Sequence, residues 1–261
     1  MALYNGVSGV AREISKKYDG VNGVAREIEN AYDGVNGVAR EYFSSGTPLS
    51  SLAVGSRVYI KVNGVSNEFI VVNQGLPSAA YDSSCDGTWL MMKDLYKERA
   101  WDSNNNDYAN SDVHAYLNSA FLGLFDSNIQ SVIKQVKIPY TNGMSSTGSV
   151  ASGANGLSTK VFLLSRAEVG FSGHYSANVE GAALTYFVGD YNEDRIAYFN
   201  GTSDIWWLRS PFVSGSNVTY AWRVISTGSG SNGQVNYSHY IRPVVILPST
   251  LEVDGSHNVK A

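Results

Sequence analysis

The alternation of hydrophobic and polar residues predicts several strands after about residue 54. Arg57 to Val62 and Glu68 to Val72 read as a strand pair, and the Asn63-Gly64 pair between them is typical of a tight turn. Thr88 to Met92 predicts another strand. Val161 to Leu164 is apolar throughout, as expected of a strand buried on both faces. We therefore expect a strand pair and further single strands in the first part of this region, while the main sheet is expected late in the chain.

Hydrophobic residues recur at helical spacing in two stretches that lie between these strands. The first stretch runs from Val113 to Leu124 and follows a candidate cap at Ser111. The second runs from Ile129 to Val136, and Ser127 with Gln130 ahead of it has the form of a capping box. The sequence therefore predicts two helices early in the domain.

The last third of the chain predicts short strands separated by loops rich in glycine and serine. The strand candidates are Trp206 to Arg209, Tyr220 to Ile225 and Arg242 to Leu247. Early helices followed by a late, loop-rich antiparallel sheet indicate an α+β fold.

The N-terminal part repeats one 14-residue unit three times, as Tyr4 to Glu13, Tyr18 to Glu27 and Tyr32 to Glu41. In the second and third units an Asn-Gly pair stands between two valines, which is typical of a β-hairpin turn. Small hairpins bury little surface alone, so repeats of this kind stack on each other or on other chains. We predict short β-hairpins that attach or oligomerise the protein, and a partly flexible linker is the alternative.

These patterns divide the chain into four parts. Residues 1–44 hold the repeats, and residues 45–53, rich in Ser, Gly and Pro, are expected to form a linker. Residues 54–254 form the main domain, and residues 255–261 are expected to be a tail.

Charge and composition exclude several classes of protein. The net charge is −4 and no run of Lys and Arg occurs, whereas a nucleic-acid-binding protein usually carries a basic stripe. We expect no membrane insertion, because no apolar run has the length of a membrane span. The start of the chain has no signal-peptide pattern, so we expect synthesis in a bacterial cytoplasm. Cys85 is the only cysteine and cannot form an internal disulfide.

Motifs for catalysis or for a firmly bound metal are missing from the sequence. The histidines are scattered, and no nucleophile elbow, zinc-protease helix or phosphate-binding loop occurs. Asp102 to Asn106 resembles the opening of a calcium loop, but Asp107 and Val113 stand where such a loop needs Gly and Glu. We expect no catalytic residue, no metal and no cofactor, and we leave open a loose cation site at residues 102–106.

Glu168, Glu180 and Asp194 are the carboxylates that could form an acid/base pair. We favour a structural role for Glu168 and Glu180, because buried carboxylates in loop-rich folds accept hydrogen bonds from backbone amides. The protein is therefore expected not to be an enzyme.

The segment from Phe212 to Tyr240 has an unusual composition. It contains no Lys, Asp, Glu or Met and consists mainly of Ser, Gly, Asn, Tyr, Thr and Val. Antibody loops use the same residues, because Tyr supplies rigid contact area and Ser, Gly and Asn supply adaptable hydrogen bonds. Apolar stretches flank it, Trp206 to Pro211 before and Ile241 to Pro248 after. The segment predicts a binding surface on a fixed framework, and a plain Gly/Ser-rich β-meander is the alternative.

Several motifs resemble a domain family of gut bacteria and their phages. The resemblance covers roughly residues 54–254. It is carried by Trp101, Tyr116-Leu117-Asn118, Ile138-Pro139, Lys160 to Ser165, Glu168-Val169-Gly170, Glu180-Gly181, Tyr186-Phe187, Arg195-Ile196-Ala197, Asn200-Gly201, Trp206 to Pro211 and Ile241-Arg242-Pro243. Members of this family resemble the variable proteins of diversity-generating retroelements, which implies a C-type-lectin-like fold. The Val-Asn-Gly-Val-Ala-Arg repeat looks like modules on phage structural proteins.

The codon chemistry of such retroelements fits the segment. They randomise adenines, typically in Asn codons, and cannot then produce Lys, Glu, Gln, Met or Trp. Between Phe212 and Tyr240 only Trp222 and Gln234 lie outside the accessible set. We assign Trp222 to the framework, and Gln234 departs from the rule.

The predicted variable, ligand-binding residues are all in this segment. They are Phe212, Val213, Ser214, Ser216, Asn217, Thr219, Tyr220, Arg223, Ile225, Ser226, Thr227, Ser229, Ser231, Asn232, Asn236, Tyr237, Ser238, His239 and Tyr240. We call them the variable set. The predicted framework residues are Trp206, Trp207, Arg209, Trp222 and Arg242.

Together these features predict a display protein that binds a protein or glycan receptor on a cell surface. It would be associated with a phage tail or virion, with phage structural proteins or copies of itself as partners through the repeats. A bacterial ligand-binding or adhesive protein without diversification is the alternative. An enzyme related to the formylglycine-generating group, which shares the lectin-like fold, is disfavoured by the single Cys85.

Overall fold

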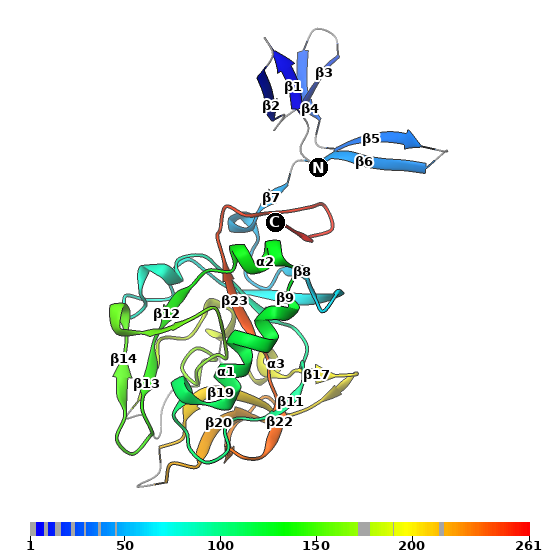
Figure 1. Ribbon diagram of the computed structural model, residues 1–261. Coiled ribbons are helices and arrows are strands. Elements are labelled where there is room, and N and C mark those ends of the chain that lie inside the picture. The colour runs from blue at the N-terminus through cyan, green and yellow to red at the C-terminus, as the bar shows by residue number, and fades with distance from the viewer. Residues whose placement is uncertain are drawn as a thin grey trace.

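The computed structural model describes residues 46–171, 178–189, 191–213 and 217–261, together with the backbone of six strands between Tyr4 and Ser44. The fold is rich in sheet and has few helices, so it is an α+β fold (Figure 1). Two five-stranded sheets form its centre.

The first sheet is antiparallel and is built mainly from early strands. Its order is β16 (Val161–Phe162), β23 (Val244–Leu247), β10 (Thr88–Met92), β9 (Val65–Gln74) and β8 (Arg57–Val62). The strands predicted at 57–62 and 88–92 are confirmed with their bounds. The expectation of a sheet confined to the late part of the chain is therefore too narrow.

The second sheet comes mostly from the last third of the chain. Its order is β11 (Glu98–Ala100), β22 (Ser238–Tyr240), β19 (Trp206–Pro211), β20 (Tyr220–Val224) and β21 (Gly230–Gln234). One pair, β19 with β22, is parallel, so the late sheet is mixed and not wholly antiparallel as expected.

The first predicted helix is confirmed. α1 (Asp112–Tyr116) continues through a π-helical turn at Leu117–Phe121 and a 3-10 turn at Leu122–Leu124. The Ser111 hydroxyl accepts a hydrogen bond from the His114 N–H, as expected of the N-cap.

The second helix is shorter than predicted, and its capping box is wrong. α2 (Ser127–Val132) has Asp126 at its N-cap with no side-chain cap bond, while Gln130 donates to the Phe125 carbonyl. Val136 belongs to β12 (Val136–Ile138), which pairs with β15 (Leu157–Thr159). A distant partner strand thus overrides the local helical spacing.

Shorter elements complete the domain. They are the hairpins β13 (Tyr140–Asn142) with β14 (Ser149–Ala151) and β17 (Tyr198–Phe199) with β18 (Thr202–Ser203), the helix α3 (Asn192–Arg195), and 3-10 turns at Leu49–Ser51, Ser83–Cys85, Tyr108–Asn110, Gly153–Asn155 and Thr185–Phe187. None of the helices in the described ranges has the length and apolarity needed to cross a membrane.

The expected linker and tail are parts of the domain. β24 (Glu252–Val253) pairs both with β7 (Thr47–Pro48) and with β25 (Val259–Lys260). Leu49 is fully buried in the core. Strand pairing at 47–48 and 259–260 and the burial of Leu49 therefore tie these segments to the domain.

The backbone of the repeats confirms the predicted hairpins. The strand pairs are β1 (Tyr4–Val7) with β2 (Val10–Glu13), β3 (Lys17–Val21) with β4 (Val24–Ile28), and β5 (Asn30–Val35) with β6 (Val38–Ser44). Each pair is antiparallel and closes at two valines. The connecting turns lie outside the described residues.

The core consists of two clusters. Adjacent residues of β19 divide between them: Trp207 packs in one cluster, and Trp206 and Leu208 pack in the other. Val245 and Ile246 of β23 divide in the same way. Because successive residues of a strand point to opposite faces, both sheets are covered on both sides.

Candidate binding surface

The variable set lies on β20, β21 and β22 and on the loops that join them. Every described member of the set is partly or fully exposed, and Tyr237 is 54% exposed. Ser214 and Ser216 lie outside the described residues. By contrast, Ala221, Val224, Gly233 and Val235 lie between members and are buried. The chain in this segment thus alternates between residues that pack and residues that face solvent.

Strand alternation divides the set between two faces of the sheet. Tyr220 stands opposite Gln234 in the β20–β21 register, while Arg223 stands opposite Ser231. Tyr220 and Arg223 are three residues apart on one strand and therefore point to opposite faces. The set therefore occupies both faces of the second sheet at this end, and Asn236 and Tyr237 lie in the loop between β21 and β22.

Contacts from outside the segment hold its backbone. The amide of Asn106 donates to the Tyr220 carbonyl over 2.8 Å, and the Trp101 N–H donates to the Val235 carbonyl over 2.8 Å. The Val235 N–H donates in turn to the Thr219 carbonyl. These bonds end on main-chain atoms, so they do not depend on which side chains the variable residues carry.

Four of the predicted framework residues are buried, namely Trp206, Trp207, Arg209 and Arg242. The Arg242 guanidinium donates to the carbonyls of Met92 and Lys93, and burial lowers its pKa to about 10. The indole N–H of Trp206 donates to the Arg195 carbonyl, and that of Trp207 to the Arg99 carbonyl. These side chains therefore bind the second sheet and the residues beside it to the backbone of other segments.

Trp222 is only partly buried and packs against the core cluster that contains Trp206. Its ring meets Phe212 edge-on at 5.2 Å between centroids, and the Arg166 guanidinium carbon lies 4.6 Å from the ring centroid. Trp222 also lines a pocket of about 290 Å³. The sequence did not predict this pocket.

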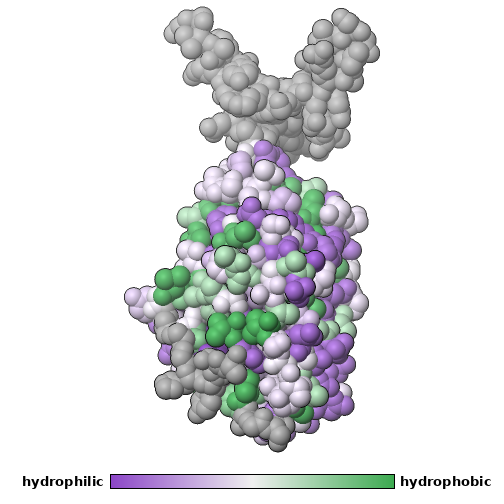
Figure 2. Space-filling model, turned by 90° about the vertical axis from the view of Figure 1, so that its left-hand side faces the viewer, coloured by the Kyte–Doolittle hydropathy of each residue, from purple (hydrophilic) through white to green (hydrophobic). Residues whose placement is uncertain are grey.

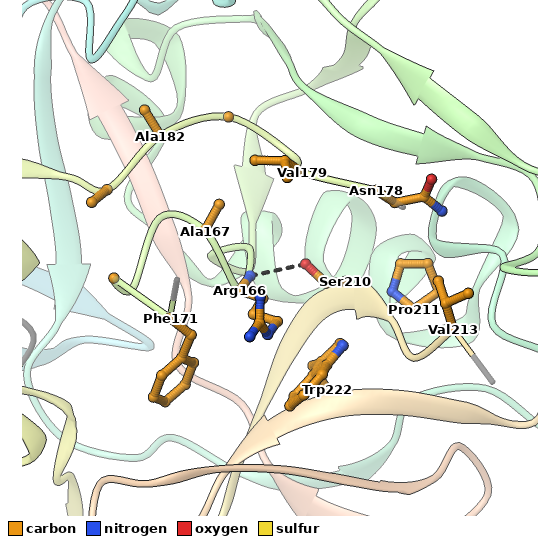
Figure 3. Close-up of a pocket in the computed structure, with 13 residues that line it drawn as sticks. Arg166, Ala167, Phe171, Asn178, Val179, Ala182, Ser210, Pro211, Val213 and Trp222 are labelled. Atoms are coloured by element: carbon orange, nitrogen blue, oxygen red, sulfur yellow. Dashed lines mark hydrogen bonds between the residues drawn. The ribbon is translucent and has the colours of Figure 1, made fainter. Parts of the chain in front are cut away.

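The pocket lies between two segments of loop and the second sheet. Figure 3 shows Arg166 and Ser210 side by side, with Trp222 on β20 and with Val179 on the adjoining loop. The backbone N–H of Arg166 donates to the Ser210 hydroxyl over 2.9 Å. Phe171 and Val179 contribute to its apolar walls. Arg166 thus combines a positive charge with an apolar setting.

A buried ion pair lies behind the pocket. Arg209 and Glu168 are both fully buried, and Arg209 Nη2 is 2.8 Å from Glu168 Oε1 while Nη1 contacts Oε2. Burial alone would lower the pKa of Arg209, but the attraction of Glu168 outweighs it and raises the pKa. The Tyr81 hydroxyl also donates to Glu168, over 2.9 Å. The role of Glu168 as a structural anchor is confirmed.

Glu180 is the second buried carboxyl of this cluster. Its Oε1 accepts the Thr141 N–H over 2.6 Å, and its Oε2 accepts the Ser210 hydroxyl. Burial raises its pKa, although the nearby Arg209 opposes this shift. Glu180 is therefore also an anchor, and it fixes the Ser210 hydroxyl beneath the pocket.

A second polar cluster lies on the other face of the sheet. Arg223 contacts the His239 imidazole, whose centroid lies 4.8 Å from that of the Trp207 ring. Burial and the positive charge of Arg223 lower the pKa of His239 to about 4, so the ring is neutral at pH 7. The neutral ring can accept a hydrogen bond from Arg223.

The carboxylate of Asp102 is engaged with its own loop. It accepts the backbone N–H groups of Asn104, Asn105 and Asp112. Over the described ranges, no group of three or more His, Cys, Asp and Glu side chains is placed to hold a metal.

Cys85 is fully buried, and burial raises the pKa of its thiol to about 12. Its Sγ contacts the Lys137 carbonyl over 3.2 Å. A thiolate is the reactive form of cysteine, so this environment disfavours reactivity.

The surface of the domain is mixed. Val179 at the pocket is 55% exposed and Val188 is 69% exposed. Figure 2 shows several separate apolar patches on one face of the domain, with polar residues between them. Exposed apolar surface of this kind is available for contact with a ligand.

Residues 86–249 match the family described as a domain of unknown function, DUF6273. The chain belongs to this family. The match covers both central sheets apart from β8 and β9, and it includes every described member of the variable set. No curated protein and no solved structure matches the chain.

In the DUF6273 domain, sequence reasoning placed the exposed residues of the segment but missed Arg166, Phe171 and Val179. These residues belong to a loop region without a recognisable motif. The one signal for Arg166 in the sequence is that it directly follows Ser165. Ser165 and Glu168 exchange hydrogen bonds in the form of a capping box. That motif fixes a turn at residues 166–170.

Proposed function

We propose that the protein is a ligand-binding display protein whose C-terminal surface is hypervariable. In this proposal the domain has a C-type-lectin-like fold, a retroelement diversifies the variable set, and the protein belongs to a phage tail or virion. The ligand is a protein or glycan receptor on a cell surface.

The observation that carries the proposal is the alternation between buried and exposed residues in residues 212–240. The described members of the variable set are partly or fully exposed, while Ala221, Val224, Gly233 and Val235 are buried. Surface substitutions usually change stability by less than about 0.5 kcal/mol, whereas substitutions that bury polar groups cost much more. A segment of this kind can change its contacts and keep its fold.

The place of the surface also supports display. In Figure 1, β19, β20 and β22 lie at the end of the domain opposite β7, the strand that directly follows the N-terminal repeats. A surface at that end stays accessible when the repeats are bound to something else. We propose that residues 1–44 attach the protein to phage structural proteins or to copies of itself. Several copies would raise a weak single contact through avidity.

Two experiments test this proposal. The first uses the full chain, linked to a fluorescent bead, and measures binding to cells of gut bacteria. Tyr237→Ala together with Asn236→Ala should abolish binding, because both side chains are exposed at the end of the sheet. Val65→Ala, at an exposed position on β9 of the first sheet, is the control and should leave binding unchanged. Equal binding by both variants would contradict the proposed surface.

The second experiment concerns diversification. A reverse transcriptase gene beside an imperfect copy of the 3′ end, rich in Asn codons, would support the retroelement, and tail genes alongside would support the phage. Relatives that keep residues 212–240 unchanged, with no such copy, would favour the bacterial adhesive protein instead.

A further inference from the structure

We propose that the stacked rings of Phe199 and Tyr240, with the carboxylates of Glu98 and Asp204 beside them, form a subsite for a neutral or N-acetylated sugar. This inference rests on the proposed function, because it names a glycan as the ligand of the candidate surface. It also extends that surface, because Phe199, Glu98 and Asp204 lie outside the variable set.

The two rings form a small aromatic platform on the surface. Phe199 on β17 is 37% exposed, and Tyr240 on β22 is partly exposed. Their centroids are 4.8 Å apart and their planes differ by 30°, so the rings are stacked. Burial of large aromatic side chains is favourable, and contiguous rings that remain in contact with solvent are therefore suited to binding a ligand.

The hairpin that carries Phe199 is fixed to the domain. β17 pairs with β18, and between them Asn200 and Gly201 have φ values of 50° and 81°. Two successive residues with positive φ are typical of a two-residue hairpin turn. The Leu95 N–H donates to the Tyr198 carbonyl over 2.9 Å and ties the hairpin to the chain beyond the first sheet. The ring of Phe199 is thus positioned before a ligand binds, which lowers the entropy lost on binding.

Two carboxylates lie beside the platform. Glu98 stands directly opposite Tyr240 in the β11–β22 register, so both side chains lie on the same face of the second sheet. Burial and the negative charges of Glu98 and Asp204 raise the pKa of Tyr240, which indicates that both carboxylates are near its hydroxyl. Neither forms a salt bridge within the described residues, and Asp204 uses Oδ1 for the Ile205 N–H. Other oxygens of the two carboxylates therefore remain to accept hydrogen bonds from a ligand.

Rings and carboxylates together select the chemistry of the ligand. A pyranose ring has C–H groups that pack against an aromatic ring, and its hydroxyls donate strong hydrogen bonds to carboxylates. A sugar acid would bring a negative charge toward Glu98 and Asp204, which repel it. An apolar peptide segment would remove water from both carboxylates without offering donors in return. A neutral or N-acetylated sugar satisfies both parts of the subsite.

The test is a titration of the full chain with soluble trisaccharides, followed by saturation-transfer NMR and by isothermal calorimetry. Cellotriose is neutral, chitotriose is N-acetylated, and trigalacturonate is acidic. We expect cellotriose or chitotriose to bind at least about fivefold more tightly than trigalacturonate, because like charges at a protein surface repel. Saturation should reach the C–H protons of the sugar ring. Binding of none of the three, or tightest binding of trigalacturonate, would overturn the proposal.

Variants of the hairpin assign the binding to the platform. Phe199→Ala should weaken the preferred trisaccharide about 5- to 20-fold, because it removes one ring, whereas Phe199→Trp keeps an aromatic face and should retain binding. Tyr198→Ala is the matched control, since Tyr198 is 45% exposed on the same strand but points to the opposite face of the hairpin. Unfolding in urea verifies that each variant is folded. Equal binding by Phe199→Ala and Tyr198→Ala would show that the platform is not the site.

A variant of Glu98 tests the role of the carboxylates. Glu98→Gln should weaken the neutral trisaccharide about 3- to 10-fold, because hydrogen bonds to a charged group are stronger than those to an amide. It should also reduce the discrimination against trigalacturonate. Glu252→Gln, an exposed carboxylate on β24, is the control and should change neither value. Unchanged affinities in Glu98→Gln would exclude the carboxylate from the subsite.

Treatment of the target cells separates a glycan from a protein receptor. Periodate cleaves the vicinal diols of sugars, so it should abolish binding of the full chain to cells, and protease treatment should not. Loss of binding after protease treatment alone would assign the surface to a protein receptor and overturn the subsite.

Failure of the two proposals can be told apart. Trisaccharide binding that Phe199→Ala weakens, without any binding to cells, would support the subsite and contradict the display function. Cell binding that requires Tyr237 but is unchanged in Phe199→Ala would support the display function and contradict the subsite.

Discussion

Glu168→Gln is the substitution that most directly tests how the framework behind the binding surface is held together. In the folded protein both oxygens of Glu168 face the Arg209 guanidinium, and both side chains are fully buried. Glutamine has nearly the same shape as glutamate but no charge. The change therefore leaves the charge of Arg209 buried without its counterion. It also places the amide NH2 group of the glutamine against groups that donate hydrogen bonds to Glu168 in the natural protein.

The expected cost follows from the burial of the pair. Removal of one partner from a buried ion pair costs about 3–5 kcal/mol. The remaining acceptors of Arg209 are the Pro139 and Leu163 carbonyls, which are neutral and cannot replace a carboxylate. For a domain of about 150–250 residues, each 1 kcal/mol lowers Tm by roughly 2–4 °C, so the variant should melt roughly 6–20 °C lower.

The assay is urea unfolding followed by Trp fluorescence at pH 7, with Glu180→Gln as the matched control. Glu180 is equally buried, but its raised pKa shows that its environment disfavours the charge. Glutamine keeps an oxygen for the Thr141 N–H, so this variant should lose only about 0.5–1.5 kcal/mol, the net contribution of one hydrogen bond.

The pH dependence separates the two carboxyls further. A carboxyl with a raised pKa contributes stability while it is protonated, and that contribution is lost as the pH rises above its ordinary value of 4.5 toward the folded pKa. The loss of stability in Glu180→Gln, relative to the natural chain, should therefore be smaller at pH 8 than at pH 5. Equal losses for the two variants at pH 7, or a loss below about 1 kcal/mol for Glu168→Gln, would refute this reasoning, because a broken buried pair costs more.

Three further predictions concern the binding surface and the repeats. Val224→Asn should destabilise the domain by about 2–4 kcal/mol, and Ile225→Asn by about 1 kcal/mol or less, because Val224 is fully buried and Ile225 is partly exposed. Urea unfolding measures the free energy of unfolding of both variants, and equal losses would contradict the alternation of buried and exposed residues. The His239 imidazole should titrate near pH 4 by NMR and return toward 6.5 in Arg223→Gln; an unchanged value would show that Arg223 does not act on it. Light scattering should give a smaller assembly when residues 1–44 are removed, and an unchanged monomer would dismiss their role in self-association.

The strands and the first helix could be predicted because the spacing of apolar residues along a segment shows which of its residues are buried. The alternation at 57–62 and the apolar run at 88–92 each reflect burial in a sheet, and both strands were placed correctly. The second helix was extended too far because Val136 continues the helical spacing although it pairs with the strand at 157–159. Pairing between distant segments has no local signature, and it decided this boundary.

The candidate surface was predictable in its composition and not in its shape. The absence of Lys, Asp, Glu and Met distinguishes this segment in the sequence, and the described members of the variable set are partly or fully exposed. The pocket could not be predicted, because Arg166, Val179, Ser210 and Trp222 come from four separate places in the chain.

Strand β19 is held by buried contacts that do not involve residues 212–240. Arg209 on this strand is bound to Glu168 and to the carbonyls of two neighbouring segments, and Ser210 beside it is held by Glu180. These buried contacts fix the strand before any residue of 212–240 contributes. We therefore expect substitutions of exposed residues on β20 and β21 to leave these contacts of Arg209 and Ser210 in place.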